Sequence, residues 1–489
     1  PESLFQPAGA SNGFLRMVTA AQRAGVPPAP TSMKVIAPGQ AVEAFRQTRW
    51  LGLNNQVESW ESLEKWHRDS TEALEDLHQS LLFPECRDTL DWRQGFTLLL
   101  SGLTQYKGSA QAMAAAALVA ATREDRGEAI ARIEDIRRVE RALESEPVLI
   151  SQLVRVASAY QALPVAWDLA QRSDWEEPDL AALQRALPST NFTRAFVASL
   201  WGEAALWAVS VKDPRMSAMI ANGGLGSGGP GLALPSNFEG VPEFVGDVLD
   251  HTRAAIYTEG WLPIWRFAWY DQALAFHLRA TDELARRWET AGDRRSLKSY
   301  SAEGVPGLGK LSGYDAMRFH FTPESLEIIE SDLAKAFRIE TQRTLIETGI
   351  AIHRFLRRHG RAPRELAELV PDWLEALPVD TMDGQPLRYR VNPEGTWRLW
   401  SVGDDFKDDD GDPTPLHPSS KPFESLHWWK AHDTVLPARA AAAEVAAWQA
   451  KEEEKLKMAP YSMDPILARR YGLILRQPTN SPSPSTNAP

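Results

Sequence analysis

Cysteine is almost absent from this chain: Cys86 is the single one in 489 residues, which excludes an intrachain disulfide. A lone thiol in a helical chain is expected to be an inert core residue. The sequence also has no run of about 18 apolar residues, the length that crosses the hydrocarbon core of a membrane. Positive charge is not in excess either, since 53 Lys and Arg face 65 Asp and Glu. With a net charge of −12, no nucleic-acid partner or anionic membrane surface is expected.

The rest of the composition is that of a globular protein, and the length allows several domains with a sizeable core. We predict an α+β fold in which a mainly helical domain precedes a smaller domain with a long helix and an antiparallel β-hairpin. Apolar periodicity and Pro- and Gly-rich stretches predict four parts: an irregular leader (1–38), the helical domain (39–303), the smaller domain (320–415), and a linker with a short helix and a disordered tail (416–489).

Within the helical domain, an Ala-rich segment from Ala110 to Ala162 predicts helices joined by tight turns. The first turn is expected near Asp125 to Gly127, and small residues on both sides of it allow close packing. This segment resembles one tetratricopeptide-like helical hairpin. No fixed period follows, so we describe the domain as helical and repeat-like.

The segment from Thr322 to Asp412 has the clearest local signals. Thr322 can cap a helix, and a long apolar stripe continues to Gly360, a plausible helix end. A short helix over 363–369 is expected next. Residues 387–391 then alternate apolar and polar side chains, and a turn leads to a returning strand over 397–402, which together predict a β-hairpin.

An ordered set of residues runs through this segment: Pro363, Leu366, Leu369, Pro378, Asp380, Gly384, Pro386, Tyr389, Ser401, Gly403 and Asp405. This order resembles the globular head of the pseudopilins, above all the major pseudopilin of type II secretion. Thr381 departs from the family, which usually has proline there. More than 300 residues precede the long helix, which in a pseudopilin begins as an N-terminal membrane segment. The resemblance therefore implies a fold and a cation site rather than the role of a pilus subunit.

Two motifs in the helical domain extend the resemblance over the whole chain. They are "EPVLISQL", from Glu146 to Leu153, and a later helix with Gly202, Glu203 and Ala205. Their order before the pseudopilin-like segment is similar to that in a group of large extracytoplasmic bacterial proteins. This resemblance implies a location in the periplasm or cell envelope. Protein partners are expected because a helical, repeat-like domain would present an interaction surface. The chain starts at Pro1 rather than Met, so an anchor supplied by a removed or missing N-terminal segment is also expected. Contact with a membrane is expected only through that segment.

The hairpin is followed by an acidic loop with six carboxylates in nine residues: Asp404, Asp405, Asp408, Asp409, Asp410 and Asp412. Like charges this close repel one another, and a hard cation such as calcium would relieve the repulsion. The loop is no EF-hand, because His417 falls where the bidentate glutamate should be. A solvated acidic loop is the alternative. The pseudopilin resemblance favours calcium, with Asp405 as the preferred ligand and Asp408, Asp409 and Asp410 competing for the other side-chain positions.

Evidence for catalysis is weak. Trp261, Trp265 and Trp269 share one helix face and suit either a sugar-binding groove or, more simply, a core stripe. Glu203 lies in an otherwise apolar helix, where it either marks a site or pairs with an arginine such as Arg194. A G-x-G-x-x-G pattern within 224–229 lacks the flanking strand and helix of a dinucleotide site, so a loop is expected there.

These observations lead to two functional hypotheses. The first is a non-enzymatic extracytoplasmic interaction or scaffold protein that carries a calcium-stabilised pseudopilin-like module. The alternative is a glycan-active hydrolase with a Trp-lined helical cleft, which would need two carboxylates about 5 to 9.5 Å apart beside exposed Trp faces.

Overall fold

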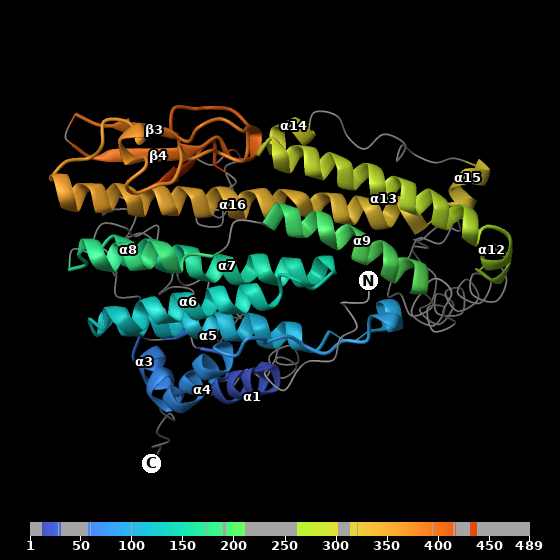
Figure 1. Cartoon of the computed structure of the whole chain (residues 1–489), viewed down its shortest axis with the longest axis horizontal. Coiled ribbons are helices and arrows are strands. Elements are labelled where there is room, and N and C mark those ends of the chain that lie inside the picture. Colours follow the sequence, from blue (N-terminus) through green and yellow to red (C-terminus); the bar gives the residue numbers. More distant parts are fainter. Residues whose placement is uncertain are drawn as a thin grey trace, which may run out of the picture.

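The computed structural model describes residues 12–27, 29–30, 57–58, 60–98, 100–172, 174–188, 192–210, 262–301, 313–319, 321–393, 395–413, 416 and 431–437. It is mostly helical, with a small three-stranded antiparallel sheet near the C-terminal region, so the predicted α+β class is confirmed (Figure 1). The glycine pattern at 224–229, Trp261 and the helix expected after 437 lie outside the described residues.

The described helices fall into an N-terminal and a C-terminal series. The first series is α1 (Phe14–Ala24), α3 (Trp60–Asp69), α4 (Thr71–Leu81), α5 (Gly102–Thr122), α6 (Arg126–Ala142), α7 (Leu149–Ala170), α8 (Glu177–Ala186) and α9 (Phe192–Ser210), with a 3₁₀ helix η2 (Trp92–Thr97). The second is α12 (Leu262–Ala268), α13 (Tyr270–Asp293), α14 (Leu297–Ser301), α15 (Gly313–Arg318), α16 (Phe321–His359) and the 3₁₀ helix η4 (Leu366–Leu369). The short strands β1 (Ala29–Pro30) and β2 (Val57–Glu58) pair in parallel.

Helix α1 corrects the prediction of an irregular leader. Phe14, Met17, Ala20 and Ala24 are buried and recur at helical spacing, so α1 presents one apolar face, and it packs on α4 and α5. The Pro and Gly residues that flank this stretch obscured its short stripe in the sequence.

The Ala-rich segment forms the centre of the N-terminal part. Residues 109–121 of α5 are all buried, and α5 packs against α6 and α7. Such a helix is apolar on every side, and its small side chains allow neighbouring helices to approach closely. The expected turn is confirmed: α6 begins at Arg126, and the Asp125 side chain caps it by accepting a hydrogen bond from the Glu128 N–H (3.0 Å). Its likeness to a tetratricopeptide hairpin stays a prediction.

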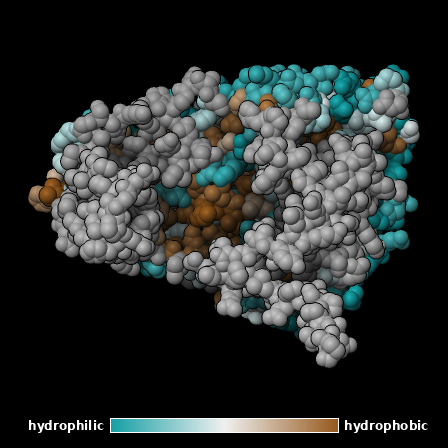
Figure 2. All heavy atoms as spheres, turned by 180° about the vertical axis from the view of Figure 1, so that it is seen from behind, coloured by the Kyte–Doolittle hydropathy of each residue, from teal (hydrophilic) through white to brown (hydrophobic). Residues whose placement is uncertain are grey.

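Among the described residues, a large buried cluster extends from α1 to the C-terminal strands. Helix α16, 39 residues long, packs against α7, α8 and α9 on one side and against the sheet on the other (Figure 1). The fully buried Trp167 of α7 reaches the sheet, with its ring edge-on to Trp397 at 6.2 Å between centroids. On the rear face, apolar side chains are visible near the centre (Figure 2). The boundary between the two predicted domains stays a prediction.

The small sheet has the strand order β3 (Arg388–Val391), β4 (Trp397–Ser401), β5 (Thr434–Leu436). The predicted hairpin is confirmed as β3 and β4, with Arg388 opposite Trp400 and Val391 opposite Trp397. Strand β5 pairs with β4 and corrects the prediction of a linker at 431–437. Because β5 is separated from the hairpin by many residues, local sequence signals could not reveal that it completes the sheet.

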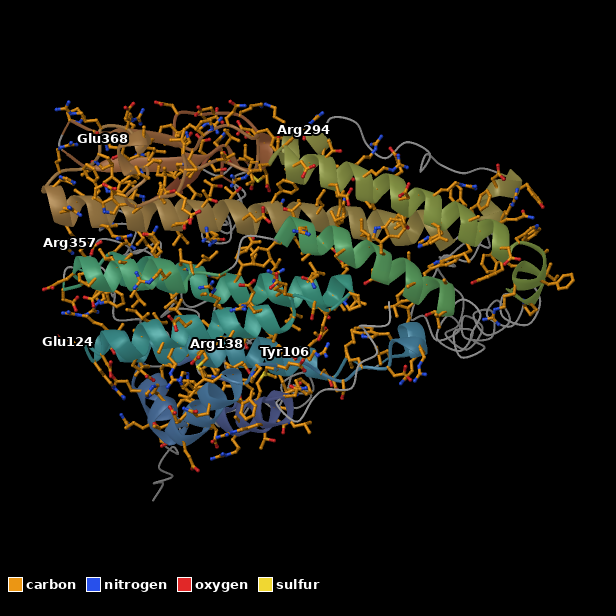
Figure 3. The ribbon with its side chains drawn as sticks, in the orientation of Figure 1. Tyr106, Glu124, Arg138, Arg294, Arg357 and Glu368 are labelled. Carbon is orange, nitrogen blue, oxygen red and sulfur yellow. The ribbon has the colours of Figure 1, made fainter. Side chains whose placement is uncertain are left out.

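Polar contacts also fix the N-terminal helices to one another. The buried Asp135 of α6 accepts hydrogen bonds from Arg132 (3.1 Å) and Arg138 (2.7 Å), and lies 2.9 Å from the His78 ring nitrogen of α4. Figure 3 labels Arg138 on α6 and Tyr106 on α5. The Tyr106 hydroxyl of α5 donates to the Cys86 carbonyl (2.8 Å). Cys86 is buried, as expected of a core thiol, and burial raises its pKa to about 12.

The two motifs of the helical domain meet at the start of α7. Gly202 of α9 lies against Pro147, where a Cβ atom would be 1.6 Å from the Pro147 carbonyl oxygen. The carboxylate of the next residue, Glu203, accepts a hydrogen bond (2.8 Å) from the backbone N–H of Leu149, the first residue of α7. Glu203 therefore caps a helix, a role in which a carboxylate is stabilised by the helix dipole. The expected arginine partner is replaced by a backbone amide.

Glu146, which begins the first motif, is 8% exposed and accepts a hydrogen bond from the Ser151 hydroxyl. Burial, with a further contribution from the negative charge of Asp88, raises the pKa of Glu146 from 4.5 to about 7. The folded protein therefore holds this proton more tightly than the unfolded chain does. The contribution of Glu146 to stability is complete below about pH 4.5 and is lost as the pH rises through 7.

Glu146→Gln mimics the protonated carboxyl. We accordingly expect the stability of this variant relative to the native chain to rise by about 2 kcal/mol between pH 5 and pH 8. The measurement is equilibrium unfolding of both proteins across this pH range. The exposed Glu289 provides the matched control, since Glu289→Gln should leave the pH dependence unchanged. Parallel stability profiles of the Glu146→Gln variant and the native chain would contradict the assignment.

Candidate metal centre

The acidic loop begins where β4 ends and returns towards β5. Its first residues form a short 3₁₀ helix, η5 (Gly403–Asp405). Near its end, Gly411 has φ of +76°, and a Cβ atom there would lie 2.9 Å from Arg398 and 3.3 Å from the Trp400 ring. Glycine is therefore required at this turn, which brings the loop back over β4.

Asp380 fixes the start of the loop. Its buried carboxylate accepts hydrogen bonds from the Met382 N–H (3.0 Å), the Val402 N–H (3.0 Å) and the Ser401 hydroxyl (2.8 Å). Arg388 donates to it as well (3.1 Å). Burial raises the pKa of Asp380 to about 6. These bonds join the 378–388 segment to the turn at the start of the loop, and they give a physical reason for Asp380 and Ser401 in the ordered set.

Thr381, which departs from the pseudopilin pattern, has its own partners on α16. Its hydroxyl lies 2.6 Å from the Thr341 hydroxyl and donates to the Phe337 carbonyl (3.0 Å). A proline would supply neither bond. Thr381 therefore attaches the 378–388 segment to the long helix α16.

Asp433 holds the other end of the loop. One of its carboxylate oxygens accepts hydrogen bonds from the backbone N–H groups of Asp409 (3.0 Å), Gly411 (2.8 Å) and Asp412 (3.2 Å). Its own N–H donates to the Asp412 carbonyl (2.8 Å). The side chain is fully buried, and burial raises its pKa to about 6. Asp433 lies 24 positions after Asp409, in the stretch predicted as linker, so the sequence analysis missed it.

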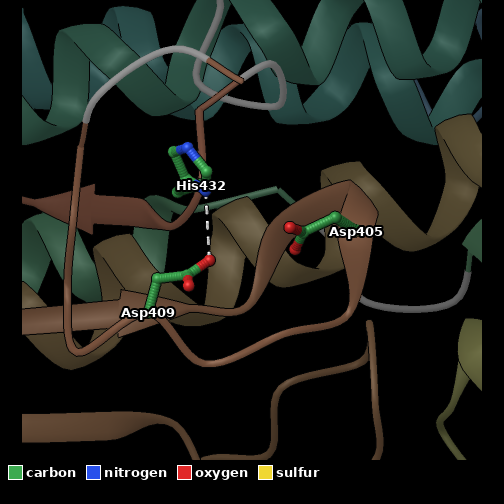
Figure 4. A group of neighbouring side chains, drawn as sticks. All are labelled: Asp405, Asp409 and His432. Carbon is green, nitrogen blue, oxygen red and sulfur yellow. Dashed lines mark hydrogen bonds and ion pairs between the residues drawn. The ribbon is translucent and has the colours of Figure 1, made fainter.

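Three side chains meet at the junction of the loop and the segment before β5. The carboxylates of Asp405 and Asp409 and the ring of His432 have potential ligand atoms within 4.8 Å of one another (Figure 4). The His432 Nδ1 lies 3.2 Å from Asp409 Oδ2. This group can hold a metal ion, because it offers two carboxylate oxygens and one imidazole nitrogen around a common space. His432 was missed for the same reason as Asp433, although the β-branched run that follows it is a weak strand signal.

Arginines engage three of the other loop carboxylates. Asp404 accepts two hydrogen bonds, of 2.9 and 2.8 Å, from Arg338 of α16. Asp408 accepts from the Trp400 indole N–H (2.9 Å) and lies 3.4 Å from Arg388, and Asp410 accepts from Arg390 (2.6 Å). Asp412 contributes its backbone to the pairing with Asp433. The predicted repulsion among six carboxylates is therefore relieved in large part by arginines that are distant in sequence.

The tryptophans considered for a sugar-binding groove pack inside the protein where they are described. Trp265 is fully buried and donates to the Arg318 carbonyl (2.9 Å). Trp269 is partly buried and donates to the Tyr314 hydroxyl (2.9 Å). Both belong to a small apolar cluster with Trp207 and Tyr270. This arrangement is what a core stripe produces, and it leaves no paired platform for a sugar in the described part of the chain.

Comparisons with protein-family models, with curated proteins and with solved structures give no match for this chain. None of the helices that the structure describes combines the length and the apolar character needed to cross a membrane.

Proposed function

We propose that the chain is an extracytoplasmic interaction or scaffold protein whose C-terminal part is a pseudopilin-like module stabilised by calcium. The observation that carries the proposal is the group of Asp405, Asp409 and His432, which joins the acidic loop to the segment before β5. A cation there would fasten two stretches of chain that are far apart in sequence, which is a structural rather than a catalytic task. The extracytoplasmic location and the protein partners rest on the resemblances stated above.

The surroundings of the group support a structural role. Asp380 and Asp433 already hold both ends of the loop through backbone N–H groups, so the loop has a defined shape before an ion binds. A catalytic metal also needs a neighbouring general base and a pocket for a substrate. Two neighbouring carboxylates of the loop, Asp404 and Asp410, are engaged in arginine pairs instead.

The identity of the ion depends on His432. Calcium takes six to eight oxygen ligands, so it would use Asp405, Asp409, backbone carbonyls and water, with His432 outside its coordination shell. Zinc and other transition ions accept imidazole nitrogen readily and would include His432. We propose calcium because the loop is rich in oxygen ligands and resembles the pseudopilin site, and we treat a transition ion as the alternative occupant.

Thermal unfolding of the full chain tests this proposal. Millimolar calcium is expected to stabilise the protein by about 1–2 kcal/mol relative to a chelator, the gain expected when a weak extracellular-type site is nearly filled. Asp405→Ala should remove that gain. Asp410→Ala is the matched control from the same loop, because Asp410 pairs with Arg390 and lies outside the group.

His432→Ala separates the two ions. If calcium is the bound ion, calcium still stabilises the His432→Ala variant, and zinc gives no comparable increase in stability. A gain with zinc alone that disappears in His432→Ala would replace calcium by a transition ion. Identical melting curves with calcium, zinc and chelator would end the proposal of a metal-stabilised module.

A further inference from the structure

An open groove lies between the N-terminal helices and the C-terminal part of the chain. Helices α8, α9 and α16, the end of α13 and the segment 371–379 line it, and both α8 and α9 pack on α16 (Figure 1). Its volume is about 1400 Å³, larger than the roughly 300–1,000 Å³ of a site for a compact small molecule. On α16 the lining runs from Glu340 to Arg354, which is roughly 20 Å of helix. The groove therefore suits a chain-like ligand.

Hydrogen bonds between the lining elements fix the shape of this groove. The Gln184 side chain of α8 donates to the Trp373 carbonyl (2.8 Å) and accepts from Arg354 of α16 (2.9 Å). Further along α16, Arg343 donates to the Pro188 carbonyl (2.8 Å), which follows α8. A site whose walls are already ordered binds its ligand without the entropic cost of ordering them.

The charged side chains of the groove balance one another. Among the described residues that line it, six are arginine and six are aspartate or glutamate, although the whole chain carries a net charge of −12. Some of them pair, as Arg343 does with Glu347 (2.6 Å). Others, such as Arg194 and Asp293, are exposed. A charged ligand would meet both signs here, whereas the hydroxyl groups of a neutral ligand can accept from guanidinium groups and donate to carboxylates.

Trp201 of α9 adds an apolar surface to this polar lining. Its side chain is 44% exposed and borders the groove, unlike the buried tryptophan of α12. The C–H groups of a sugar ring form an apolar face that packs on an aromatic ring, while its hydroxyl groups bond to polar neighbours. A few polar groups around an aromatic surface are the usual composition of a site that orients such a ligand.

A peptide finds less support in the same groove. Peptides are commonly bound as an added strand on a sheet edge or as an amphipathic helix in an apolar groove. None of the described strands contributes to the lining, and charged side chains interrupt its apolar surface. The groove therefore lacks both features.

We propose that this groove binds a neutral oligosaccharide, with one sugar ring on Trp201 and further hydroxyl groups bonded to Arg194 and Glu340. Trp201 and Arg194 are seven residues apart on one face of α9, roughly 10 Å along the helix, so the ligand needs more than one sugar unit to reach both. The Glu340 carboxylate accepts a hydrogen bond from the Thr193 N–H (2.8 Å), and burial raises its pKa to about 7. Near neutral pH this carboxyl can both donate to a hydroxyl and accept from one. The inference does not depend on the metal site, which lies in another part of the molecule.

Isothermal titration calorimetry of the full chain tests the proposal. The probes are three neutral hexasaccharides (cellohexaose, maltohexaose and chitohexaose), the anionic hexagalacturonate and the peptide hexaglycine. At least one neutral hexasaccharide should bind, more tightly than the anionic sugar and the peptide. Trp201→Ala should weaken that binding about tenfold or more, because the sugar ring loses its apolar surface. Arg194→Ala should weaken it about threefold to tenfold.

Phe267 of α12 provides the matched control, since this aromatic side chain is 96% exposed and lies outside the groove. Phe267→Ala should bind the saccharide as the native chain does, and circular dichroism shows whether each variant remains folded. Binding should also be equal with calcium and with a chelator, which separates this result from the metal proposal. A native chain that binds none of the neutral hexasaccharides would overturn the inference. So would tighter binding of hexagalacturonate or hexaglycine, or a Trp201→Ala variant with native affinity.

Discussion

Replacement of Asp380 by alanine is expected to destabilise the full chain by about 4 kcal/mol, because four hydrogen-bonding groups lose their shared acceptor in a buried place. The Met382 and Val402 N–H groups, the Ser401 hydroxyl and Arg388 all donate to this carboxylate. Arg388 would keep Asp383 (2.5 Å) and Asp408 (3.4 Å) as partners but would lose its contact with Asp380. Denaturant-induced unfolding gives the change in free energy.

The exposed Asp372 is the control for this substitution, since Asp372→Ala removes a carboxylate of the same type from the surface and should cost little. Hydrogen exchange adds a local measurement, because the Val402 amide should lose protection in Asp380→Ala. A loss of stability no larger than that of Asp372→Ala would show that Asp380 does not fix the loop.

Replacement of Gly202 by alanine is expected to destabilise the chain by about 3 kcal/mol. The added Cβ atom would lie 1.6 Å from the Pro147 carbonyl oxygen and 2.6 Å from its carbon, and backbone atoms cannot rotate away as a side chain can. The start of α7 would have to move away from α9. This movement would also weaken the hydrogen bond from the Leu149 N–H to Glu203.

Gly108 of α5 is a matched control, because a Cβ atom there would meet nothing within 4 Å. Gly108→Ala should be neutral or stabilising, since alanine favours the helix and reduces the freedom of the unfolded chain. Unfolding of both variants by denaturant makes the comparison. Equal stability of Gly202→Ala and Gly108→Ala would contradict the close contact between the two motifs.

Local periodicity was sufficient to predict much of the fold. The stripe of α16 and the Ala-rich helices report burial directly, and both appear where they were expected. The hairpin also forms where it was expected, but the alternation predicted for its first strand does not match burial, since Tyr389 is half-buried and Val391 is exposed. Strand β5 was not predicted, because a strand of three residues carries no period of its own and gains its place only by pairing with β4. Helix α1 was hidden for a similar reason, since its stripe is short and lies among Pro and Gly residues.

The acidic loop shows why a site is harder to predict than a fold. The sequence identified the loop and named Asp405 and Asp409, but it treated six carboxylates as one charge cluster. Arg338, which pairs with Asp404, lies 66 positions before it in the sequence. Asp433, which follows the hairpin and the loop, accepts hydrogen bonds from three backbone N–H groups of the loop. These partners depend on tertiary packing, so no local spacing rule selects which carboxylates remain for an ion. His432 could be joined to the group only once β5 was in place.

The most direct test of the central claim is the amount of calcium that the full chain binds at equilibrium, measured by dialysis against calcium followed by elemental analysis. The native chain should bind one calcium ion per molecule at the Asp405 and Asp409 site, and Asp409→Ala should lose it while Asp410→Ala retains it. Calcium binding that is absent from the native chain, or that is the same in native and Asp409→Ala proteins, would contradict the account.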